Sequence, residues 1–158
     1  MTTMDLEKTS TDRIEKRVAL RAPQTRVWRA ITNADEFGAW FGVKLEGTFA
    51  EGAAMRGRIT HPRYEHVTME MLVERIQPEF LFSYRWHPYA VDAGVDYTAE
   101  PTTLVEFQLD EVGGETILTI VESGFDRLPA SRRAEAFRMN DGGWTSQLKS
   151  IERYVTNG

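Results

Sequence analysis

The chain of 158 residues contains no cysteine. Without thiols it forms no disulfide, no thiolate metal site and no cysteine nucleophile. No apolar run approaches the ~20 residues that a membrane-spanning helix requires. The first eleven residues are polar and lack the apolar segment of a secretory signal. We therefore expect a cytoplasmic protein without a membrane span.

Positive charge is also scarce, since 19 Lys and Arg residues face 24 Asp and Glu residues, a formal net charge of −5. Nucleic-acid binders draw much of their affinity from neutralising phosphates, so this balance argues against nucleic acid as a partner. The three histidines, His61, His66 and His87, lack the spacing of a helical zinc motif. We expect them to lie on the surface or to anchor loops, and we predict no metal, cofactor or catalytic residue.

The length suits one domain with a real core, because 41% of the residues are hydrophobic. We predict a flexible tail over residues 1–11 and a single domain over residues 12–158. No repeat, low-complexity stretch or internal linker divides the chain.

Period-two alternation of apolar and polar residues predicts half-buried strands. In the segment 67–76, the alternation places Arg75 on the same apolar face of the strand as Val73. In the segment 80–86, it places Phe80 on the same face as Phe82. Gly113-Gly114 is a strong hairpin signal. The predicted strands are 13–21, 43–45, 55–59, 67–76, 80–86, 103–112 and 115–123.

Helical spacing occurs in three places. Pro23 suits the beginning of a short helix, and Asn33 can cap a second one, with Glu36 three residues further on. Pro129 opens a long helix that should run to about Tyr154. Strands in hairpin order form an antiparallel sheet, and only the long helix can cover its apolar face. We therefore predict an α+β helix-grip fold, with a curved sheet of six to seven strands wrapped around the C-terminal helix.

Five motifs follow one another in a characteristic order: Ala22-Pro23 with Val27-Trp28 and Ile31-Thr32, Phe37 to Phe41, Gly113 to Thr116, Glu122 to Phe125, and Gly143-Trp144. In this order they resemble the START-like, or SRPBCC, superfamily, and in particular its bacterial branch related to the C-terminal domain of the heat-shock-protein-90 ATPase activator. The resemblance implies a cavity between sheet and helix, in which superfamily members bind lipids, sterols, polyketides or hormones; some members are cyclases or aromatases.

The strongest candidate site is an aromatic-lined pocket between the sheet and the long helix, because ligand sites are mostly apolar with a few placed polar groups. The alternative is that these side chains simply fill the core. The predicted ligand-binding residues are Trp40, Phe41, Met69, Met71, Phe82, Tyr84, Trp86, Phe107, Glu122, Phe137, Asp141 and Trp144.

Two acidic residues interrupt the apolar pattern. Asp141 falls on the apolar stripe of the long helix, and Glu122 has the parity of buried neighbours. Burying a lone carboxylate is costly, so either could pair with Arg75, act as an acid or base with a raised pKa, or lie solvated at the cavity mouth. The adjacent Gly142 and Gly143 indicate a kink, space for a ligand or, most simply, close packing.

The loop 87–101 is long enough to be a lid, anchored by Tyr89 and Tyr97, or else a surface loop or dimer contact. The favoured function is binding of a hydrophobic or aromatic small molecule. One alternative is a stress-related protein that contacts a chaperone, and another is a cyclase- or hydratase-like acid–base enzyme. A homodimer through an exposed strand edge is also compatible with the sequence.

Overall fold

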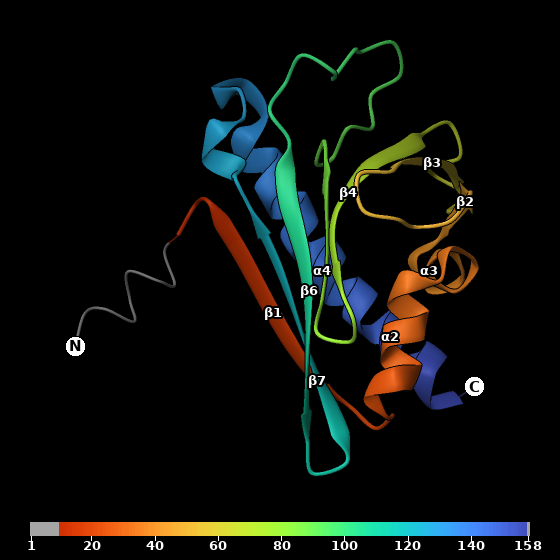
Figure 1. Ribbon diagram of the computed structural model, residues 1–158. Coiled ribbons are helices and arrows are strands. Elements are labelled where there is room, and N and C mark those ends of the chain that lie inside the picture. Colours follow the sequence, from red (N-terminus) through yellow and green to blue (C-terminus); the bar gives the residue numbers. More distant parts are fainter. Residues whose placement is uncertain (1–9, 158) are drawn as a thin grey trace, which may run out of the picture.

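The computed structural model describes residues 10–157 and contains a seven-stranded antiparallel sheet with the strand order β1-β7-β6-β5-β4-β3-β2 (Figure 1). The predicted helix-grip fold is confirmed. Most of the expected tail lies outside the described residues. The strands are β1 (Arg13–Leu20), β2 (Val43–Glu46), β3 (Ala54–Ile59), β4 (Thr68–Gln77), β5 (Leu81–Trp86), β6 (Thr103–Val112) and β7 (Glu115–Ser123), and the helices are α2 (Gln24–Thr32), α3 (Ala34–Phe41), η1 (Phe125–Arg127) and α4 (Ala130–Asn157).

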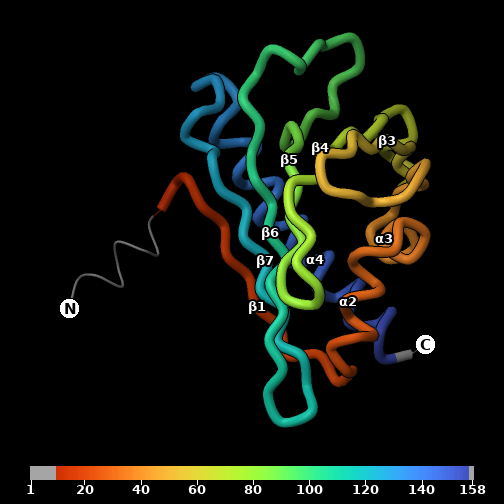
Figure 2. The backbone as a smooth tube through the Cα atoms, viewed as in Figure 1, coloured from red at the N-terminus to blue at the C-terminus, as the bar shows by residue number. Residues whose placement is uncertain are grey.

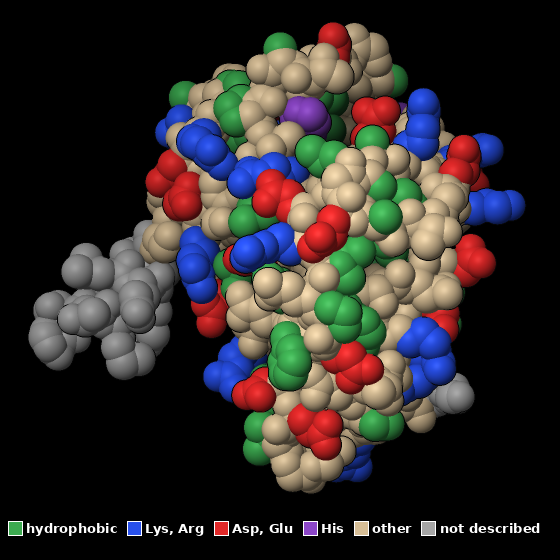
Figure 3. Space-filling view, in the orientation of Figure 1, with side chains coloured by type: hydrophobic (Ala, Val, Ile, Leu, Met, Phe, Trp, Pro, Cys, Tyr) green, Lys and Arg blue, Asp and Glu red, His purple; other side chains and the backbone are tan. Residues whose placement is uncertain are grey.

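The long helix α4 crosses one face of the curved sheet, and α2 and α3 lie beside its C-terminal half (Figures 1 and 2). The core forms where these layers meet: Trp144 and Ile151 of α4 pack with Phe107 of β6 and Ile120 of β7. Acidic and basic side chains are interspersed over the opposite face of the sheet (Figure 3). Although α4 has 28 residues, none of the helices described is apolar enough over a sufficient length to cross a membrane.

The two short helices begin and end as their sequences indicate. The carbonyl of Pro23 accepts hydrogen bonds from the N–H groups of Arg26 and Val27 at the start of α2. The predicted cap is confirmed, because the side chain of Asn33 accepts a 3.0 Å hydrogen bond from the N–H of Glu36. After α3, Gly42 adopts a φ of 94°, which a residue with a Cβ rarely does, and the chain turns into β2.

The prediction that Phe80 shares a strand face with the buried Phe82 was wrong. Its N–H closes a tight turn onto the carbonyl of Gln77, and β5 begins only at Leu81, so the Phe80 side chain is 62% exposed.

The predicted facing of Arg75 was also wrong. A β-bulge in β4 places Val73 opposite Tyr84 but Arg75 opposite Ser83, which leaves Glu74 as the extra residue. The bulge reverses the parity of the strand, so Arg75 is exposed and Ile76 packs against the core.

Candidate functional site

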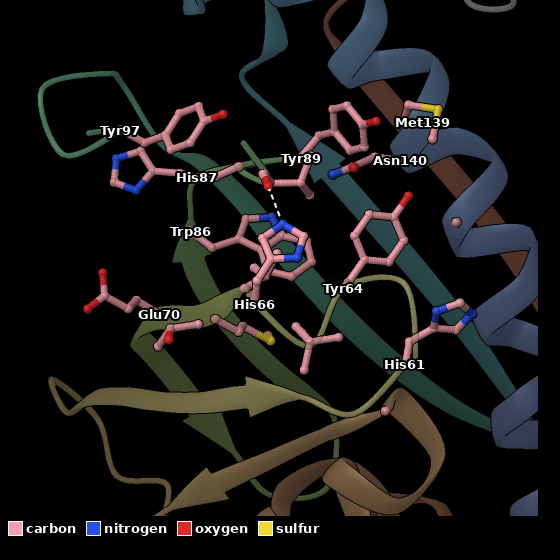
Figure 4. Close-up of a pocket in the computed structure, with 18 of the residues that line it drawn as sticks. His61, Tyr64, His66, Glu70, Trp86, His87, Tyr89, Tyr97, Met139 and Asn140 are labelled. Carbon is pink, nitrogen blue, oxygen red and sulfur yellow. Dashed lines mark hydrogen bonds between the residues drawn. The ribbon is translucent and has the colours of Figure 1, made fainter. Parts of the chain in front are cut away.

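A cavity of about 970 Å³ lies between α4, the β3–β4 connection and the long loop 87–102 (Figure 4). This volume is at the upper end of the range typical of small-molecule sites. The two connections meet there because β4 begins, and β5 ends, at the same end of the sheet. The site is therefore assembled from segments that are far apart in the sequence.

Five of the predicted site residues line this cavity. Three aromatic rings form one wall: the ring centroids of Trp86 and Trp144 are 5.9 Å apart, and Phe41 lies 6.0 Å from the first and 6.1 Å from the second. Trp40 and Met69 complete the predicted set at the cavity.

Five other predicted residues lie elsewhere. Met71, Phe82, Tyr84 and Phe107 are buried in the core behind the cavity wall. The sequence left open that the aromatic and methionine side chains simply fill the core, and this alternative describes the position of these four residues. Phe137 packs partly buried against Phe125, with the ring centroids 5.1 Å apart, and does not line the cavity.

Asp141 requires a correction, because its carboxylate faces neither the cavity nor Arg75. Its side chain is 47% exposed and pairs with Nζ of Lys16 on β1 at 3.0 Å. Successive residues of a helix are rotated by about 100°. Asn140 and Trp144 face the cavity side, and Asp141 is turned away from it toward β1.

Glu122 lies directly behind the aromatic wall, 0% exposed and outside the cavity itself. Its Oε2 accepts hydrogen bonds from the indole N–H of Trp86 at 2.7 Å and from the hydroxyl of Thr103 at 2.6 Å. Its Oε1 accepts from the indole N–H of Trp144 at 2.8 Å and from the Asn140 amide at 2.9 Å. Pairing with Arg75, one of the alternatives that the sequence left open for this residue, therefore does not occur. Four neutral donors hold this carboxylate instead.

Burial raises the pKa of Glu122, and the hydrogen bonds from its four donors oppose that shift. Burial, together with the nearby charge of Glu122, also raises the pKa of Tyr84 well above the ordinary tyrosine value. The Tyr84 hydroxyl has no hydrogen-bond partner within residues 10–157. Glu122 thus orients two cavity tryptophans through a fully buried carboxyl group.

The long loop lines the cavity, as a lid would, and is tied to the rest of the protein. Arg132 of α4 binds Oε1 of Glu100 at 2.7 Å and the carbonyl of Tyr89 at 3.3 Å, and its guanidinium lies 4.9 Å from the centroid of the Tyr97 ring. On the other side, Nε2 of His66 is 2.9 Å from the carbonyl of Val91 (Figure 4).

Sequence reasoning missed several cavity residues because they lie in connections. It treated the three histidines as surface or loop anchors. His66 and His87 do contact loop carbonyls, the latter at 3.1 Å from Glu100, yet all three histidines also line the cavity. Tyr64 was missed entirely. The clustering of histidine and tyrosine in two connections at one end of the sheet was the available signal.

The glycine pair in α4 also requires a correction. Close packing was the expected reason for it, but apart from the chain neighbours and the surrounding helix backbone, no atom of residues 10–157 lies within 4 Å of a Cβ at either Gly142 or Gly143. Gly143 borders the cavity, whereas Gly142 does not. The missing side chain at Gly143 therefore leaves space in the cavity.

Comparison with known proteins supports the same fold. Residues 21–156 match the family described as activator of Hsp90 ATPase homolog 1-like protein. The chain belongs to this family, and the resemblance drawn from its sequence motifs is confirmed. No curated protein matches the chain.

Several solved structures are similar. DynU16, from the dynemicin biosynthetic locus, shares 25% identity over 92% of this chain with a TM-score of 0.70, and the chain spans about half (47%) of its length. MLL2253 from Mesorhizobium loti shares 19% identity, with 92% of this chain and 97% of that chain covered and a TM-score of 0.72. The Aha1 dimer from Colwellia psychrerythraea shares 15% identity, with coverages of 90% and 95% and a TM-score of 0.70. The last two demonstrate the shared fold.

Proposed function

We propose that the protein binds a hydrophobic or aromatic small molecule in the cavity beneath α4. This proposal depends on one observation, the aromatic wall of Phe41, Trp86 and Trp144. Both indole N–H groups of this wall donate hydrogen bonds to Glu122, which lies behind it. With its polar atoms satisfied from behind, the wall offers apolar ring surface to the cavity.

Gly143 supports the same proposal. A glycine inside a helix costs about 1 kcal/mol relative to alanine. In the described part of the chain, a Cβ at this position would contact nothing beyond its own helix backbone and chain neighbours, so packing does not require the glycine. An occupant of the cavity would account for it.

The acid–base enzyme is the weaker alternative. Both oxygens of Glu122 accept hydrogen bonds from four donors, and the carboxylate does not line the cavity. Asp141 faces Lys16 on another side of the helix. Neither carboxylate is placed to exchange a proton with a molecule in the cavity.

The test uses N-phenyl-1-naphthylamine, a neutral probe whose fluorescence rises in apolar surroundings. We expect saturable binding to the wild type. Gly143→Leu should fill part of the cavity and weaken binding about tenfold or more. Gly142→Leu, on the same helix but outside the cavity, is the matched control and should bind like the wild type.

Native mass spectrometry of protein purified from its own host complements this titration. Extra mass that is lost on denaturation would identify the natural ligand. If the probe does not saturate, or if Gly143→Leu binds as the wild type does, the cavity is not the binding site. That result would favour the alternative function, a stress-related protein that contacts a chaperone. The homodimer predicted from the sequence stays a prediction.

A further inference from the structure

The charge of the cavity is one-sided. The described residues that line it include three carboxylates, Glu70, Asp92 and Asp96, and neither a lysine nor an arginine. All three carboxylate residues are exposed, and they lie on β4 and the long loop. Three carboxylates therefore lie at the cavity with no Lys or Arg in its lining; Arg56, the cross-strand partner of Glu70, lies outside that lining.

A further carboxylate lies behind the inner wall. Glu122 is fully buried, and the described residues offer it no Lys or Arg within ion-pair distance. The indole N–H groups of Trp86 and Trp144 can only donate hydrogen bonds. Three of the four partners, the two indoles and the Asn140 amide N–H, can only donate, which favours the ionised carboxylate; the Thr103 hydroxyl is the one partner that could accept from the protonated acid.

This arrangement changes the rings that the ligand meets. A hydrogen bond from an indole N–H to a carboxylate polarises the indole, because linked hydrogen bonds reinforce one another where the dielectric is low. The polarisation moves electron density toward the ring, and the negative face of an indole already attracts cations. The Trp86–Trp144 wall is thus more attractive to positive charge, and less attractive to an anion, than two isolated tryptophans.

We propose that the ligand of this cavity is a hydrophobic cation, an aromatic or alkyl amine whose positive charge lies between the Trp86–Trp144 wall and the carboxylates of the opening. This inference rests on the proposed function, because it specifies the charge of the molecule that the cavity binds. Apolar contact supplies affinity for neutral and charged ligands alike, and the electrostatics select among them.

The test compares three naphthalene probes of similar size by isothermal titration calorimetry: (2-naphthylmethyl)trimethylammonium, 2-naphthylmethanol and 2-naphthoate. All three probes are measured at the same pH of about 8, at which each keeps its stated charge. We expect the ammonium probe to bind about tenfold more tightly than the alcohol, and the carboxylate to bind more weakly than the alcohol. Gly143→Leu should weaken all three if they bind in the cavity.

Variants separate the two sources of negative charge. Glu122→Gln should reduce the preference for the ammonium probe over the alcohol about threefold, whereas Glu111→Gln, an exposed residue at the distant end of β6, should not change it. The double variant Asp92→Asn, Asp96→Asn removes charge from the opening and should also reduce the preference, with the exposed Asp110→Asn as its control; it keeps the inference testable if circular dichroism shows that Glu122→Gln does not fold.

The outcomes are distinguishable. If none of the three probes binds the wild type saturably, the proposed function itself fails. If the alcohol and the ammonium probe bind equally, or the naphthoate binds most tightly, the cavity binds ligands but the inferred cation preference is wrong. A preference that survives both the Glu122 and the Asp92/Asp96 substitutions would also overturn the inference.

Discussion

The indole N–H of Trp144 on α4 donates a 2.8 Å hydrogen bond to Oε1 of Glu122 on β7. This bond joins the C-terminal helix to the sheet directly behind the cavity. Oε2 of the same carboxylate accepts from the indole N–H of Trp86 on β5, so Glu122 fixes the two tryptophans of the cavity wall relative to each other. The stability of the fold and the shape of the site thus depend on one buried side chain.

Glu122→Ala should lower the free energy of unfolding by about 3–5 kcal/mol, because it leaves two buried donors, on Thr103 and Trp144, and two partly buried ones without their acceptor. Urea denaturation measures this loss. Glu111→Ala, at an exposed position, should change stability by less than about 0.5 kcal/mol. A loss below about 1 kcal/mol for Glu122→Ala would show that the network contributes little.

The pH dependence of stability tests the environment of Glu122. Burial raises its pKa, so the folded protein holds this proton more tightly than the unfolded chain does. The contribution of Glu122 is therefore fully present below the unfolded pKa of about 4.3 and declines as the pH rises through the raised value. We expect the stability of the wild type relative to Glu122→Gln to fall with increasing pH across this window, as urea denaturation at several pH values would show. A rise would mean that the four hydrogen bonds outweigh burial.

Glu36 links three helices and should have the opposite pH dependence. Partial burial acts to raise its pKa, but hydrogen bonds from Arg26, Tyr154 and Arg29 prevail and lower it. Its contribution is present above the unfolded pKa and is lost as the pH falls through the lower folded value. Glu36→Gln should cost about 1 kcal/mol at pH 7, and thermal denaturation at pH 3 should show a smaller difference. A constant difference would assign the effect to packing.

Arg132 should restrain the loop over the cavity, since it contacts Glu100, Tyr89 and Tyr97. Arg132→Met should raise amide hydrogen exchange in residues 87–102 about tenfold, because the loop loses these contacts while its own backbone is unchanged. Arg138→Met, on the exposed side of α4, is the control. Unchanged exchange in the loop would mean that its other contacts suffice to hold it.

Gly142 offers a stabilising substitution. Among the described residues, a Cβ at this position would meet no atom within 4 Å other than its chain neighbours and its own helix backbone, and the residue is helical, exposed and outside the cavity. Gly142→Ala should therefore raise the free energy of unfolding in urea by about 0.5–1 kcal/mol through helix propensity alone. It should leave probe binding unchanged. A decrease in stability would reveal a need for glycine that the packing does not show.

The predicted elements were close to the observed ones where a short-range pattern determines structure. Alternation located the strands, and the Asn33 cap was found from one residue and its neighbour three positions on. Patterning failed at Arg75, because a bulge changes parity without any sign in a single strand. It failed at Asp141 because a helix with neighbours on several sides has no single inner face.

The candidate site was predicted only in part. Large aromatic residues indicate buried positions. The sequence does not distinguish a ring that borders a cavity, such as Trp86, from one that fills the core, such as Phe82. The cavity residues of the two connections carry no periodic pattern, so their proximity to Trp144 could not be foreseen.

The sequence by itself determined the element order, the antiparallel sheet and the helix that covers it, because periodicity and capping act between residues close in the chain. Only the tertiary structure decided that Glu122 would accept bonds from β5, β6 and α4 at once, and that Gly143 would face open space. The reason is physical: a buried carboxylate is tolerated only where donors from distant segments converge, and that convergence is a property of the packed layers.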